Sequence, residues 1–181
     1  KFAKLEVDCG INYEPNGILF DRSLDSIYSP IDHVIVDWQH TMVGDGVANT
    51  VIGTALNIIK KYGFEREQVV EFMMLCNLPS KYGKPHETWL GKNRLKKDSL
   101  TSFSSTLLSM LPIIQLFMEH FCGACAELLD VRRLVTLIHT ICGVFAAGPD
   151  AANRYQVQLR KLICELHQLC VLIGAQLKPK I

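Results

Sequence analysis

Two residues in the first quarter of the chain have side chains suited to acid–base or metal chemistry. Asp37 follows His33–Val36, a run with three consecutive β-branched residues that predicts a strand buried on both faces. A carboxylate at the end of such a strand is held rigidly by the strand, and the chain that follows it is exposed to solvent. His40 follows three residues later and is a candidate partner of Asp37. In the structural alternative, Asp37 caps a turn and His40 hydrogen-bonds locally.

The cysteines offer a second kind of chemistry. There are seven, and Cys122 and Cys125 form one C-x-x-C pair. A structural zinc site commonly needs two such pairs. A second group of candidate ligands lies within residues 164–170, but the helical pattern there places Cys170 on a different face of the helix from the other ligands. We therefore expect buried, reduced thiols without metal. Nothing near any cysteine is typical of a hydrolase nucleophile.

A basic segment, residues 77–97, offers a third kind of chemistry. It carries six cations against one acid, Glu87, and it is too rich in glycine, proline and lysine for us to expect burial. If the chain belongs to a DNA-binding family, we expect this segment to contact the DNA backbone, because phosphate contacts dominate DNA affinity. In the alternative, it is a solvated loop that keeps the protein soluble. The candidate contacts are Lys92, Arg94, Lys96 and Lys97.

The elements that must position these residues change character near residue 45. Before it lie short runs broken by turn residues, with one or two β-strands; after it, apolar residues recur with a helical period. Asp45 is the predicted N-cap and Gly63 the C′ residue of the first helix, and Pro112 should kink or split the third. The predicted helices cover about 46–62, 65–76, 99–121, 125–144 and 150–173.

The last predicted helix has the most regular pattern. Its apolar residues are spaced by four and three, which is a seven-residue repeat through Tyr155, Leu159, Leu162, Leu166, Leu169 and Ile173. We interpret it as one helix of an intramolecular bundle and expect its leucines to pack on the third and fourth helices. The alternative is a seam for homo-oligomerisation through residues 155–173.

Composition limits the classes of protein that remain. The chain has 181 residues, 49% hydrophobic and 20% charged, with a net charge of +1. This excludes a disordered chain and a strongly cationic arm. The most apolar run, 134–147, is short for a membrane span, so we expect no membrane segment. Cysteines within apolar helical patterns are typical of a reducing compartment, so we expect an intracellular protein. The fold class is mainly α, a bundle of about five helices, with residues 1–44 and 45–181 as separate regions.

One segment resembles a known family. Val34–Val43, followed by Gly46 and Val47, is similar to the aspartate–aromatic–x–histidine segment of DDE-type transposases of the CACTA and Kyakuja-Dileera-Zisupton kind. Residues 5–20, 103–112 and 125–129 also resemble parts of transposon-derived reading frames. The resemblance covers most of the chain, although its functional motif is short.

The resemblance implies a ribonuclease H-like core interrupted by a helical insertion. Asp37 would be the second catalytic acid and a ligand of Mg²⁺ or Mn²⁺, with His40 beside it, and residues 45–181 would be the insertion. No strand-borne acid precedes Asp37, and the chain ends before a later acid. We therefore expect a fragment of a transposase-like protein, nuclear if functional, inactive alone and without a small-molecule cofactor. The alternative is a non-catalytic helical protein-interaction module.

Overall fold

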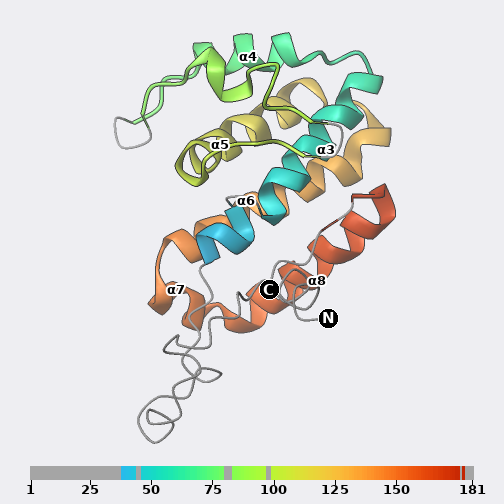
Figure 1. Cartoon of the computed structure of the whole chain (residues 1–181). Coiled ribbons are helices and arrows are strands. Elements are labelled where there is room, and N and C mark those ends of the chain that lie inside the picture. Colours follow the sequence, from blue (N-terminus) through green and yellow to red (C-terminus); the bar gives the residue numbers. More distant parts are fainter. Residues whose placement is uncertain (1–37, 44–45, 80–82, 97–98, 176, 178–181) are drawn as a thin grey trace, which may run out of the picture. The chain divides into compact units, whose positions relative to one another are not determined.

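The computed structural model describes residues 38–43, 46–79, 83–96, 99–175 and 177, all within one compact unit. Six α-helices follow one another along this part of the chain, with no strand among its elements, which confirms the mainly helical class (Figure 1). The predicted N-terminal strands and Asp37 lie outside the described residues. Residues 38–43 pack on the bundle: Val43 is buried and the Trp38 ring stacks on Phe145. The predicted boundary at residue 45 stays a prediction.

The first two long helices have the predicted ends, within a residue or so. α3 (Val47–Lys61) has Gly46 as its N-cap, one residue later than the predicted Asp45. Gly63 then takes a positive φ of 88°, which only glycine adopts without strain, and ends α3 as predicted. α4 (Arg66–Leu75) begins with a capping box in which the Glu65 backbone N–H donates to Gln68 Oε1 at 2.8 Å.

α5 (Ser104–Phe121) and α6 (Leu129–Ala146) form the centre of the core. α5 begins five residues after the predicted Ser99, because residues 99–103 bind α3 and an adjacent loop instead of forming a helical turn. Pro112 lies inside α5 without dividing it, so the predicted split is wrong. α6 follows a short 3₁₀ turn, Ala126–Leu128, and contacts α3, α5 and the later helices.

The segment predicted as one final helix forms two helices in the structure. α7 (Pro149–Arg154) and α8 (Gln156–Ile173) meet at Tyr155, whose φ of −104° and ψ of 19° depart from helical values. Gly148, with φ of 96°, separates α7 from α6. Because the chain bends at a single residue, both α7 and α8 contact α6.

The seven-residue repeat packs against the core of the same molecule. Leu159 and Leu166 are buried, whereas Leu162 and Leu169 are only half-buried. Among the described elements α6 is the main contact of α8, so the prediction holds for the fourth helix. Most of the other side chains of α8 are exposed, as is Tyr155, the first position of the repeat, which directly precedes α8.

By length and composition alone, one stretch among the described residues, Thr41–Lys61, could cross a membrane. In its most apolar window 56% of the residues are buried inside the structure. A core helix of a bundle meets the same criteria, and α3 occupies that position between η3 (Gln39–Val43) and α6.

Candidate nucleic-acid interface

The end of the predicted basic loop pairs with the segment that follows it, which was predicted to be helical. We call these two arms, residues 91–96 and 99–103, the strap. Its arms form an antiparallel bridge between Leu95 and Leu100. The Lys96 N–H donates to Ser99 O at 2.8 Å, and the Thr101 N–H donates to Arg94 O at 2.7 Å. The strap therefore has its own main-chain hydrogen bonds.

Three residues on one face of α3 bind the strap. Asn49, Gly53 and Asn57 are four residues apart, so a helix places them in one row. The Leu100 N–H donates to Asn49 O at 2.8 Å, Asn49 Nδ2 donates to Ser102 O at 3.2 Å, and Asn57 Nδ2 donates to Lys96 O at 3.2 Å.

The middle residue of this row must be small. A Cβ added to Gly53 would lie 2.4 Å from the carbonyl carbon of Ser99. The main chain of the strap therefore crosses α3 directly over Gly53. A row of small and polar residues on one face of α3 is the feature of the sequence that indicates this docking, and our sequence analysis missed it.

The loop is also partly buried, contrary to prediction. Leu90, at the end of η5 (Glu87–Leu90), and Leu100 lie in the core, and Trp89 and Leu95 pack against it. The prediction failed because it was based on composition and not on position: several apolar residues of this region pack on the bundle, whereas Lys84, Lys92 and Lys96 are exposed.

The four predicted DNA contacts have different positions. Lys92 and Lys96 are exposed, Arg94 is half-buried with its guanidinium carbon 5.8 Å from the centre of the Phe103 ring, and Lys97 lies outside the described residues. Two of the four are thus exposed lysines on the strap.

Lys92 and Lys96 lie beside cations of two helices. A cleft of about 400 Å³ between the strap, the end of α3 and the start of α4 is lined by both lysines, Lys60 and Arg66. Lys60 pairs with Glu65 at 3.3 Å, and Arg66 pairs with Glu67 at 2.5 Å. Among the described residues, neither Lys92 nor Lys96 belongs to an ion pair.

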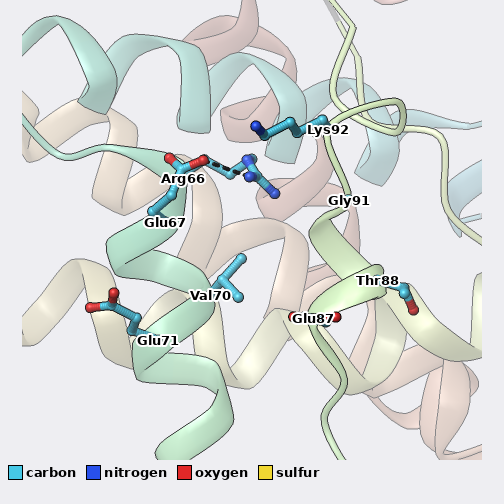
Figure 2. Close-up of a pocket in the computed structure, with 8 residues that line it drawn as sticks. All are labelled: Arg66, Glu67, Val70, Glu71, Glu87, Thr88, Gly91 and Lys92. Carbon is cyan, nitrogen blue, oxygen red and sulfur yellow. Dashed lines mark hydrogen bonds and ion pairs between the residues drawn. The ribbon is translucent and has the colours of Figure 1, made fainter.

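A second pocket, of about 450 Å³, adjoins this cleft between α4 and η5 (Figure 2). Lys92 extends from the strap toward the Arg66–Glu67 pair, and Val70 points into the pocket. Arg66 also donates to the Leu90 carbonyl, so its guanidinium is already engaged on two sides. The hydrogen bond from Arg66 lowers the pKa of Glu67, with a smaller contribution from Lys92, so Glu67 is a carboxylate at neutral pH.

The predicted catalytic pair is not assembled in the described part of the chain. Asp37 lies outside it, and His40 lies within η3. Across the described ranges, no group of three or more histidine, cysteine or acidic residues is placed to hold a metal ion. The roles assigned to Asp37 and His40 stay predictions.

The C-x-x-C pair lies in the turn between α5 and α6. Cys122 is buried, and burial raises its pKa to about 11. Cys125 donates to Glu127 Oε2 at 3.2 Å, and burial followed by this hydrogen bond raises its pKa as well. Both are free thiols, and their raised pKa values make them poor nucleophiles at neutral pH.

The chain matches no protein-family model, no curated protein and no solved structure. The resemblance to transposases that the sequence analysis proposed stays a prediction.

Proposed function

We propose that this chain is the helical part of a transposase-like protein and that its strap contacts the DNA backbone. The observation that carries the proposal is the position of Lys92 and Lys96. Both are exposed on a strap fixed to α3, and both line one cleft with Lys60 and Arg66. An ammonium group outside an ion pair can neutralise a phosphate without first breaking another contact.

The neighbouring helix cations have a supporting role. Glu65 and Glu67 balance much of the charge of Lys60 and Arg66, so the local excess of positive charge comes from the strap. Contacts of this kind read the phosphates and not the base edges. We therefore propose binding that is salt-dependent and independent of sequence.

Catalysis is a separate part of the proposal. By the resemblance, Asp37 and His40 belong to a metal-dependent core completed by residues elsewhere in a longer protein, which would work in the nucleus with Mg²⁺ or Mn²⁺. We assign no catalytic step to the described residues, and we expect no nuclease or strand-transfer activity from the isolated chain.

The salt dependence of duplex binding tests the proposal. Each phosphate contact contributes about 0.9 to the slope of log K against log salt. Replacing both lysines, Lys92→Gln with Lys96→Gln, should therefore flatten the slope by about 1.8. The matched control, Arg160→Gln with Lys161→Gln, removes the same charge from exposed positions of α8 and should leave the slope unchanged. Equal slopes for the parent and the strap variant would contradict the proposal.

The outer face of α8 favours the second candidate, a protein-interaction module. Val157, Cys164 and Val171 are exposed and seven residues apart, so they form one row on the side of α8 away from its buried leucines. A second copy of the chain could pack against this row. Light scattering tests this: Val171→Glu should convert a dimer to a monomer, and a parent chain that is monomeric at every concentration would exclude self-association.

A further inference from the structure

One aromatic ring at the end of the strap is unusually exposed. Phe103 is 74% exposed, although it directly precedes α5 and follows Ser102, which is buried. Large aromatic side chains usually bury most of their area, and Phe103 has no polar atom that would favour contact with water. The other aromatic rings of α5 instead pack together, with Phe117 and Phe121 4.9 Å apart.

The main chain around Phe103 is well fixed. Its carbonyl accepts a hydrogen bond from the Leu107 N–H at 2.9 Å, which forms the first turn of α5. On the other side, the Asn49 amide holds the Ser102 carbonyl at 3.2 Å. The ring therefore projects from a rigid base.

Arg94 lies over this ring. Its guanidinium carbon is 5.8 Å from the ring centre, within the range of a cation–π interaction. The Arg94 carbonyl accepts from the Thr101 N–H at 2.7 Å, so both partners are fixed by the paired arms of the strap. Lys96 is exposed two residues further along the same arm.

We propose that the strap binds single-stranded nucleic acid, with an unpaired base stacked on Phe103 and backbone phosphates on Arg94 and Lys96. This inference rests on the proposed function and names the form of nucleic acid that the strap takes. Binding of single strands combines cations along the backbone with aromatic rings under the bases, and both are present here. In a duplex, neighbouring base pairs already cover the faces of each base, so Phe103 would contribute little.

Fluorescence anisotropy with two labelled probes tests the inference. The probes are an oligothymidylate of about 16 nucleotides, within the usual site size, and a duplex of the same length. Phe103→Leu keeps an apolar side chain but removes the ring. It should weaken binding of the oligothymidylate by about fivefold or more, with less than a twofold change for the duplex.

Two further variants make the result specific. Phe103→Trp keeps a flat ring and should bind the oligothymidylate at least as tightly as the parent. Phe121→Leu makes the same change at the other end of α5, where the side chain is 47% exposed, and should not change the affinity for either probe. Circular dichroism of each variant verifies that the helices are retained.

The outcomes separate this inference from the proposed function. Single-strand binding that Phe103→Leu leaves unchanged overturns the role of the ring, even if Lys92→Gln with Lys96→Gln still flattens the duplex slope. A Phe103→Trp variant as weak as Phe103→Leu also overturns it. If the parent chain binds neither probe, both the inference and the proposed function fail.

Discussion

The strap and α8 are attached to the same core by different kinds of contact. The strap is held by main-chain and amide hydrogen bonds to α3 and by the close approach over Gly53, in addition to the buried side chain of Leu100. α8 is held by apolar side chains, chiefly Leu159, Leu166 and Cys170, and by an exposed ion pair to α6.

The difference affects what each region can do. Because much of the attachment of the strap is through its backbone, side chains such as those of Lys92 and Lys96 stay exposed. When a helix is anchored through its side chains, the row that holds it is no longer available to a partner. Only the outer row of α8 could then serve an interaction.

The largest expected effect is the loss of a buried leucine from α8. Leu166 is 3% exposed, and Leu166→Ala should lower the free energy of unfolding by about 2–5 kcal/mol. Leu172, 68% exposed on the same helix, is the matched control, and Leu172→Ala should change stability by less than about 0.5 kcal/mol. Chemical denaturation measures both. Similar small losses would mean that α8 is not held by its leucines.

The second prediction concerns the crossing of the strap over α3. Gly53→Ala places a Cβ against backbone atoms that cannot rotate away, and should cost about 1–3 kcal/mol. Gly143, also within a helix, has no neighbour within 4 Å of an added Cβ. Gly143→Ala should therefore stabilise the protein by about 0.5–1 kcal/mol through helix propensity. Thermal unfolding of the two variants should give shifts of opposite sign, and a stabilised Gly53→Ala would show that the strap is loosely placed.

The smallest expected effect is in the ion pair between α6 and α8. Arg133 donates to both carboxylate oxygens of Glu165, at 2.6 and 2.9 Å, and lowers the pKa of Glu165. Because this pKa is lower in the folded than in the unfolded chain, the stabilisation is present at neutral pH and is lost as the pH falls through the acidic range.

Glu165→Gln should therefore slightly reduce stability at pH 7 and make unfolding less sensitive to acid. Denaturation at a series of pH values measures this, and added salt should diminish the effect because both side chains are partly exposed. An unchanged acid dependence would mean that the ion pair contributes nothing to the attachment of α8.

Much of the helical framework could be predicted from the sequence. The ends of α3 and α4 follow from Gly63, Glu65 and the apolar period, and the end of α6 follows from Gly148 and Pro149. These features are local, because a helix forms its hydrogen bonds between residues four apart and its caps within a turn. The mainly helical class was determined in the same way.

The tertiary structure decided how the strap and α8 are used. Asn49 binds Ser102, 53 residues further along the chain, and no local pattern reveals such a partner. The bend at Tyr155 and the exposure of half of α8 likewise depend on where α6 lies. Periodicity shows which residues can share a face, but only packing against other elements determines whether that face is buried or left to bind a ligand.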